Sequence, residues 1–150
     1  MEETVLAYIH KNNKYLLLYR NKKKNDINKN KWIGVGGHLE KGETSEDALK
    51  REIKEETGLD VLEYKKNGVV YFSNESCNEI MHLYTVSKTK GRLIECDEGV
   101  LKYFSKSEML KLPMWEGDKI FLEYLLSNAP YFELKLEYRG DSLVRSEKLK

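Results

Sequence analysis

The chain has 150 residues, with 26 Lys or Arg against 25 Asp or Glu, which gives a formal net charge of +1 at pH 7. This length suits one substantial hydrophobic core and is barely enough for two, so we expect a single domain over residues 1–150. The balanced charge gives no support to nonspecific binding of nucleic acid or of an anionic membrane, so we expect a small-molecule partner.

The cysteines and the N-terminal residues bear on the compartment. Cys77 and Cys96 fit neither a disulfide framework nor a zinc site with paired ligands, and we expect free thiols. The first ten residues are acidic where a signal peptide is basic, and no run approaches the roughly 18–20 apolar residues that span a bilayer. We therefore expect a protein of the reducing cytoplasm.

Two strand-like runs begin the chain and are joined by a short polar turn. Residues 4–10, TVLAYIH, and residues 14–20, KYLLLYR, are rich in aliphatic and aromatic side chains, as β-strands are. With the intervening KNN they predict a hairpin over residues 4–20. Residues 21–31 are polar and without periodicity, so we expect a loop whose lysines face either solvent or the phosphates of a ligand.

A glycine-rich loop leads into the clearest helical segment. Its glycines let backbone approach a ligand or ion closely, and they are Gly34, Gly36, Gly37 and Gly42. Thr44 or Ser45 is the predicted N-cap, and Asp47 lies in the first turn, where an acid is favourable. Gly58 is the predicted end of the helix.

Three glutamates crowd the last turns of this helix, where the helix dipole repels negative charge. At about 100° per residue, Glu52 and Glu56 fall between the apolar Ala48 and Leu49, and Glu55 falls just beyond Ala48. The solvent-facing arc is expected to hold Asp47, Lys50, Arg51 and Lys54. Either each acid pairs with a Lys or Arg from elsewhere, or the three bind a divalent cation. Their i, i+3, i+4 spacing beside the core favours the cation, which prefers oxygen ligands.

The rest of the chain alternates strands with two more helices. The predicted strands cover residues 61–72, 79–89, 99–105 and 131–140, and the predicted helices cover residues 105–110 and 117–128. Residues 142–150 are expected to form a last edge strand. Because helices and strands are interleaved, we expect one α/β or α+β domain.

The segment from Gly37 to Leu59 resembles the signature of the Nudix hydrolase family. The signature is a glycine, five residues, a glutamate, seven residues, and then Arg-Glu-aliphatic-x-Glu-Glu-x-Gly-aliphatic. Its nine fixed positions are filled by Gly37, Glu43, Arg51, Glu52, Ile53, Glu55, Glu56, Gly58 and Leu59. The resemblance implies an α/β fold, an α/β/α sandwich with a mixed β-sheet. It also implies a loop-helix-loop motif that binds Mg²⁺, with Mn²⁺ as the alternative.

The same resemblance assigns roles to these residues. Glu52, Glu55 and Glu56 are the implied metal ligands and catalytic acids, and a carbonyl of Gly36 or Gly37 is a further candidate ligand. Glu43 is implied to pair with Arg51, an ion pair that braces the loop against the helix. Family members take their general base from a signature glutamate or from an acid in a later loop. In the sequence ECDEG, Glu98 is that candidate, and the alternative is a solvated turn carboxylate.

A weaker resemblance covers nearly the whole chain and points to the MutT-like branch, which includes the 8-oxo-dGTP diphosphatases. In that comparison Trp115 matches a residue that stacks on the base and Asp118 one that hydrogen-bonds to it; core packing is the alternative for Trp115. Animal oxidised-purine enzymes carry Asn where this chain has Ile33 and a second acid where it has Gly117. Ile33 can therefore pack against a base but cannot hydrogen-bond to its edge.

The resemblance implies a Mg²⁺-dependent Nudix pyrophosphohydrolase that cleaves a nucleoside triphosphate to a nucleoside monophosphate and pyrophosphate. An oxidised purine such as 8-oxo-dGTP is one candidate substrate. ADP-ribose, a nucleotide sugar and a dinucleoside polyphosphate are alternatives, because the signature contacts the diphosphate that all of them share. A non-catalytic nucleotide-binding sensor is the alternative from another class, although it would be expected to lose signature glutamates and none is lost here.

Overall fold

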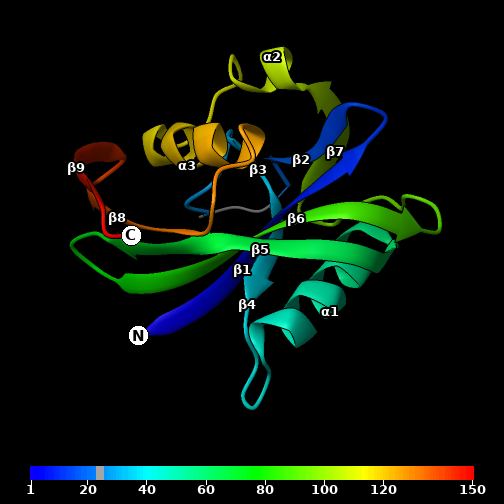
Figure 1. Ribbon diagram of the computed structural model, residues 1–150, viewed down its shortest axis with the longest axis horizontal. Coiled ribbons are helices and arrows are strands. Elements are labelled where there is room, and N and C mark those ends of the chain that lie inside the picture. The colour runs from blue at the N-terminus through cyan, green and yellow to red at the C-terminus, as the bar shows by residue number, and fades with distance from the viewer. Residues whose placement is uncertain (23–25) are drawn as a thin grey trace.

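The computed structural model describes residues 1–22 and 26–150, so part of the predicted loop 21–31 lies outside the described residues. Within the described residues, nine strands form one mixed sheet, and helices lie on both of its faces (Figure 1). The expected α/β/α sandwich with a mixed sheet is therefore confirmed. None of the described helices is long and apolar enough to cross a membrane.

The main path of the sheet runs in the order β3-β2-β1-β6-β5-β8-β9, with β4 paired to β1 and β7 paired to β2. The strands are β1 (Glu2–Lys11), β2 (Lys14–Arg20), β3 (Trp32–Ile33), β4 (Val35–His38), β5 (Asp60–Ser73), β6 (Asn78–Lys90), β7 (Gly99–Ser105), β8 (Phe132–Arg139) and β9 (Ser142–Lys148). The helices are α1 (Ser45–Thr57), α2 (Lys106–Met109) and α3 (Glu116–Leu126). β1 pairs in parallel with β6 and β5 with β8, whereas the other pairs are antiparallel.

The predicted N-terminal hairpin is confirmed. β1 and β2 pair antiparallel with Lys11 opposite Lys14, so only two residues make the turn. These residues, Asn12 and Asn13, have φ of 51° and 62°. Asparagine tolerates this left-handed region better than most residues do, and two-residue hairpins favour it because its twist matches that of the strands.

β1 is buried on both faces because a helix covers each side of the sheet. Residues 4–9 of this strand are all buried. On one face, α1 packs Ala48, Leu49 and Ile53 into a core with Val5 and Val86. The opposite face packs against α3, and its core includes Leu6, Leu83, Phe121, Leu122 and Leu125. β1 and the adjacent β4 therefore lie where both layers meet, next to the loop that leads into α1.

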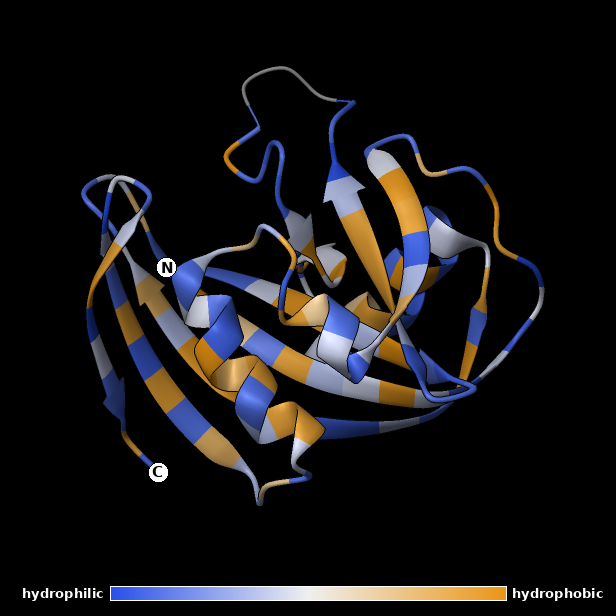
Figure 2. Ribbon diagram, turned by 90° about the horizontal axis from the view of Figure 1, so that it is seen from above, coloured by the Kyte–Doolittle hydropathy of each residue, from blue (hydrophilic) through white to orange (hydrophobic). Residues whose placement is uncertain are grey.

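The C-terminal strands have the alternation expected of a half-buried sheet. In β8 the buried residues are Phe132, Leu134, Leu136 and Tyr138. Hydrophobic and hydrophilic bands alternate along the strands at this edge of the sheet (Figure 2). β9 pairs antiparallel with β8 and forms the edge, as predicted. The burial of Tyr138 brings a C-terminal residue to the cavity described next.

Candidate active site

Local hydrogen bonds define where α1 begins and ends. Thr44 is the N-cap: its hydroxyl accepts a hydrogen bond from the Asp47 backbone N–H at 3.1 Å, and the Asp47 carboxylate accepts one from the Thr44 backbone N–H at 3.2 Å. This reciprocal capping box satisfies two donors that a helix N-terminus would otherwise leave unpaired. At the other end, Gly58 has φ of 81° and its N–H donates to the Lys54 carbonyl. The acids of the last turns are thus presented from a well-defined helix.

Arg51 joins this helix to the loop before it. Its Nε and Nη2 atoms donate to the two Glu43 carboxylate oxygens at 2.7 and 2.9 Å, and Nη2 also donates to the His38 carbonyl at 3.0 Å. Its Nη1 atom donates to Glu52 at 2.7 Å. These Arg51 hydrogen bonds lower the pKa of Glu43 to about 2. The predicted position of Arg51 on the solvent arc is wrong, since its side chain folds over the loop and is only 22% exposed.

Glu56 is the buried acid of the site. The residue is 7% exposed, and its carboxylate accepts a hydrogen bond from the Gly36 backbone N–H at 3.0 Å. Burial is the main cause that raises the pKa of Glu56 to about 10, and a hydrogen bond with Glu98 and the charge of Glu98 add to it. Burial and the nearby Glu98 thus favour the protonated form of Glu56, whereas a cation beside it would favour the carboxylate.

Glu52 contacts Gly37, which lies with Gly36 in strand β4 and not in a loop as the sequence predicted, because both pair with β1. A Cβ atom added to Gly37 would lie 2.6 Å from the Glu52 carboxyl carbon, closer than real Cβ contacts allow. Glycine at this position therefore permits the approach of backbone and carboxylate that the sequence suggested. Burial raises the pKa of Glu52, and the hydrogen bond from Arg51 partly offsets this.

Glu55 differs from the expectation that all three acids point at or beside the protein body. Its side chain is 58% exposed, and its carboxylate lies 3.2 Å from Arg51 Nη1. The i, i+4 spacing places the two on one helix face, and an exposed carboxylate avoids the cost of desolvation. The role of Glu55 as a metal ligand stays a prediction.

The loop between β6 and β7 brings two further groups to Glu56. A carboxylate oxygen of Glu56, the Cys96 Sγ atom and a carboxylate oxygen of Glu98 all lie within 4.8 Å of one another. Cys96 is a free thiol, as predicted, and it is buried at this cluster. Its position was not predicted, because the only sequence signal was its place two residues before Glu98. Arg20 Nη1 lies 3.3 Å from Glu98, and Glu98 lines the cavity, so it is not a purely solvated turn carboxylate.

The donor set suits a divalent cation of the kind that the signature implies. Glu52 lies against Gly37, Glu56 accepts a hydrogen bond from Gly36, and hard cations such as Mg²⁺ take such oxygen ligands. Glu98 lies beside Glu56. Burial is the first cause of the raised pKa of both Glu52 and Glu56. Gly36 and Gly37 lie in β4 opposite Leu6 and Val5, and their carbonyls as ligands stay a prediction.

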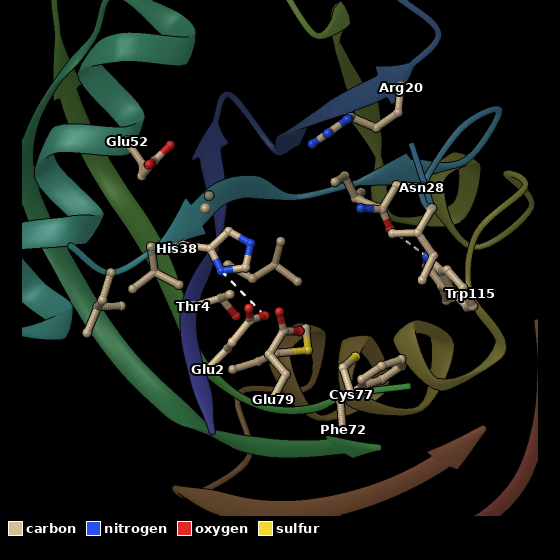
Figure 3. Close-up of a pocket in the computed structure, with 18 of the residues that line it drawn as sticks. Glu2, Thr4, Arg20, Asn28, His38, Glu52, Phe72, Cys77, Glu79 and Trp115 are labelled. Carbon is tan, nitrogen blue, oxygen red and sulfur yellow. Dashed lines mark hydrogen bonds and ion pairs between the residues drawn. The ribbon is translucent and has the colours of Figure 1, made fainter. Parts of the chain in front are cut away.

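A cavity of about 650 Å³ leads from these acids to an aromatic end. Glu52 and Glu98 line one part of it, and the aromatic end includes Phe72, Trp115 and Tyr138. Between them, Glu2, His38 and Glu79 gather on one wall, whereas Asn28 and Trp115 lie on the other side (Figure 3). The cavity thus has an acidic region and an aromatic region. Its volume is typical of small-molecule sites.

Trp115 belongs both to the core and to the cavity wall. The residue is 6% exposed, and its ring packs edge-on against Tyr138 with centroids 5.2 Å apart. Its indole N–H donates to the Asn28 side-chain oxygen at 2.7 Å, and Lys31 Nζ lies 4.4 Å from the ring centroid. The two alternatives considered for Trp115, core packing and ligand contact, are therefore compatible in this position.

Asp118 and Ile33 also line this end of the cavity. Burial raises the pKa of Asp118 to about 8, although the charge of Lys31 acts in the opposite direction. At neutral pH this carboxyl group is largely protonated, so it can donate as well as accept a hydrogen bond. Ile33 contributes only apolar surface, as its sequence predicts.

Gly117 stands where animal oxidised-purine enzymes carry an acid, and the surrounding residues leave no space for a side chain at this position. Its backbone N–H donates to the Tyr138 hydroxyl at 2.7 Å. A Cβ atom at this position would lie 2.6 Å from that hydroxyl and 2.5 Å from Leu136 Cδ1. Neither contact was predicted, because Tyr138 is 21 residues away in sequence.

A mixed sheet between helices, with a capped acidic helix closing one end of a cavity, is the architecture of a Nudix domain. The NUDIX domain model matches residues 2–125, and the chain belongs to the Nudix hydrolase family. It is 30% identical over 111 residues to the oxidized purine nucleoside triphosphate hydrolase of Mus musculus, covering 73% of this chain and 71% of that protein. It is also 30% identical over 131 residues to the CTP pyrophosphohydrolase of Escherichia coli, covering 85% of this chain and 93% of that protein.

Among solved structures, the chain resembles a mutator MutT protein from Bacillus halodurans, with a TM-score of 0.89. The match covers 99% of this chain and 98% of that chain at 23% sequence identity. This likeness shows a shared fold over nearly the whole chain, including the C-terminal strands that lie beyond the matched domain model.

Proposed function

We propose that this Nudix hydrolase is a Mg²⁺-dependent pyrophosphohydrolase that cleaves a nucleoside triphosphate to a nucleoside monophosphate and pyrophosphate. The observation that carries the proposal is the continuity of one cavity, which has carboxylates of Glu52 and Glu98 at one part and Trp115 and Asp118 at another. A nucleotide has matching parts, a charged phosphate chain and a flat base. The names of the mouse and E. coli relatives support a nucleotide substrate.

In this proposal Glu52, Glu55 and Glu56 would hold the divalent ion, with a carbonyl of Gly36 or Gly37 as a further candidate ligand and Mn²⁺ as the alternative to Mg²⁺. When bound, such an ion would neutralise charge on the diphosphate and lower the pKa of the attacking water. Glu98 lies at the cavity and accepts the proton of the water that attacks phosphorus. Arg20, 3.3 Å from its carboxylate, holds Glu98 in position.

The other end of the cavity binds the base. Trp115 offers an aromatic surface, and Asp118 offers a carboxyl group that is largely neutral at physiological pH because burial raises its pKa to about 8. Arg51 contacts Glu43 and Glu52 instead of substrate, so it positions the loop and the acids. An oxidised purine such as 8-oxo-dGTP is the favoured substrate within this class, supported by the name of the mouse relative.

A substrate panel tests the proposal. It includes unmodified and oxidised dNTPs, ADP-ribose, a nucleotide sugar and diadenosine polyphosphates, each with Mg²⁺ and again with EDTA, and the products are identified by ion-exchange chromatography. Monophosphate and pyrophosphate from a dNTP support the proposal when EDTA abolishes both. Turnover restricted to ADP-ribose, a nucleotide sugar or a dinucleoside polyphosphate would replace the substrate. Saturable binding with no product would indicate a sensor.

A further inference from the structure

Asn28 lies at the aromatic end of the cavity and is held there by its own loop. Its backbone N–H donates to the Asp26 carboxylate at 3.0 Å, and that carboxylate also accepts a hydrogen bond from Arg20 Nε at 2.7 Å. Its carbonyl accepts a hydrogen bond from the Lys31 N–H at 3.0 Å. Asn28 is half-buried and lines the cavity together with Ile33 and Trp115. The loop therefore presents this side chain in a defined place.

The orientation of the Asn28 amide follows from the chemistry of its partner. The Trp115 indole N–H is a donor only, so the amide oxygen of Asn28 must face it, at 2.7 Å. The amide nitrogen then points away from Trp115, as Figure 3 shows. Within residues 1–22 and 26–150, no acceptor is hydrogen-bonded to this nitrogen. Its N–H groups are thus available to a molecule in the cavity.

Few other groups at this end can recognise the edge of a base. Ile33 is apolar, and Gly117 cannot carry a side chain without displacing Tyr138. The Tyr138 hydroxyl already accepts a hydrogen bond from the Gly117 N–H. Its O–H can still donate, so Asn28, Asp118 and Tyr138 are the polar groups beside Trp115 that can contact the edge of a base, and among them Asn28 presents an amide N–H.

We infer that Asn28 is a specificity-determining residue, whose fixed amide N–H selects a base with an oxo group over one with an amino group at the same ring position. An oxo group accepts the hydrogen bond from the Asn28 N–H. An amino group would place its own N–H opposite that N–H, so neither donor would have an acceptor. Loss of such a pair typically changes the preference by roughly ten- to a hundredfold. The inference rests on the proposed function, because it assumes that the base occupies this end.

The test compares dITP with dATP, whose bases carry an oxo group and an amino group at position 6. We expect the wild type to have at least about tenfold higher kcat/KM for dITP. Asn28→Asp keeps an oxygen for the Trp115 N–H and replaces the amide nitrogen with an acceptor. We expect it to reduce the dITP-to-dATP ratio by at least about tenfold, mainly through KM.

The matched control is Asn30→Asp, which makes the same chemical change at an exposed position of the same loop. Asn30 does not line the cavity, and its side-chain oxygen is 3.4 Å from the Tyr19 hydroxyl. The control should keep the wild-type ratio. If Asn28→Asp fails to fold, Asn28→Ser removes the amide N–H groups without adding charge, and the ratio should approach one.

The outcomes separate the inference from the function on which it rests. Wild-type turnover of both nucleotides with a ratio that neither Asn28 variant changes would overturn the role of Asn28 and leave the proposed function intact. A wild type that hydrolyses neither nucleotide, nor any other dNTP, would overturn both. A reduced ratio in Asn28→Asp, with the ratio of Asn30→Asp unchanged, supports the inference.

Discussion

The Glu56→Gln variant tests two effects of Glu56. One is the loss of folding stability that this buried acid causes in EDTA, and the other is its contribution to metal binding. Glutamine has nearly the shape of a protonated glutamate. Its side-chain oxygen can accept the hydrogen bond from the Gly36 N–H, and its NH₂ group can donate to Glu98. The variant is therefore expected to keep the local structure while removing a group that titrates.

The expected magnitude follows from the pKa of Glu56, which burial and Glu98 raise from 4.5 to about 10. Below pH 4.5 the folded and unfolded states both hold the proton. Above it, only the folded state does, so stability falls by about 1.4 kcal/mol per pH unit until the folded group ionises. Because pH 7 lies about 2.5 units above 4.5, the wild type loses about 3 kcal/mol that Glu56→Gln retains.

Urea unfolding in EDTA, followed by tryptophan fluorescence at several pH values between about 5 and 8, measures this difference. The stability advantage of Glu56→Gln should grow as pH rises. With Mg²⁺ at about a hundred times its Kd, the wild type should gain about 3 kcal/mol, whereas the variant should gain little and hydrolyse no nucleotide. Equal stability of the two proteins across this pH range would refute the argument, as would equal protection by Mg²⁺.

Three other variants test separate parts of the site. Glu43→Gln should flatten the acid side of the stability curve: because Arg51 lowers the pKa of Glu43 from 4.5 to about 2, the stabilisation is present above pH 4.5 and lost as pH falls toward 2. Thermal unfolding at both ends of this interval checks it, and an unchanged acid loss would contradict it. Gly37→Ala should displace Glu52 and weaken Mn²⁺ binding by about tenfold or more, measured by calorimetry, because its Cβ would lie 2.6 Å from the carboxyl carbon. Wild-type Mn²⁺ affinity would contradict this. Gly117→Asp should cost about 1–3 kcal/mol in urea unfolding, because its Cβ would lie 2.5 Å from Leu136 Cδ1 and 2.6 Å from the Tyr138 hydroxyl; wild-type stability would rule out the proposed clash.

The parts of the fold that depend on nearby residues could be predicted from the sequence. Thr44 and Gly58 define the ends of α1 through bonds to residues three and four positions away. The hairpin at Asn12 and Asn13 likewise needs only a short turn between two apolar runs. These features follow from backbone geometry and side-chain chemistry within a few residues, which the sequence displays directly.

The rest of the site depends on contacts between distant segments. A helical wheel gives the direction in which Arg51 leaves the helix, but its long side chain then folds toward Glu43. Cys96 lies at Glu56 because the loop between β6 and β7 packs there, and no periodicity indicates that packing. Asn28 belongs to a polar segment without a pattern, so its bond to Trp115, 87 residues later, could not be anticipated.

The Asp26 carboxylate has a consequence for how such an enzyme could change its substrate. It binds Arg20, which contacts Glu98, and also the backbone of Asn28, which contacts Trp115. One short peptide segment thus anchors both the proposed proton acceptor, Glu98, and the wall proposed to contact the base. A substitution in this segment that changes the range of substrates is therefore expected to change the turnover rate as well.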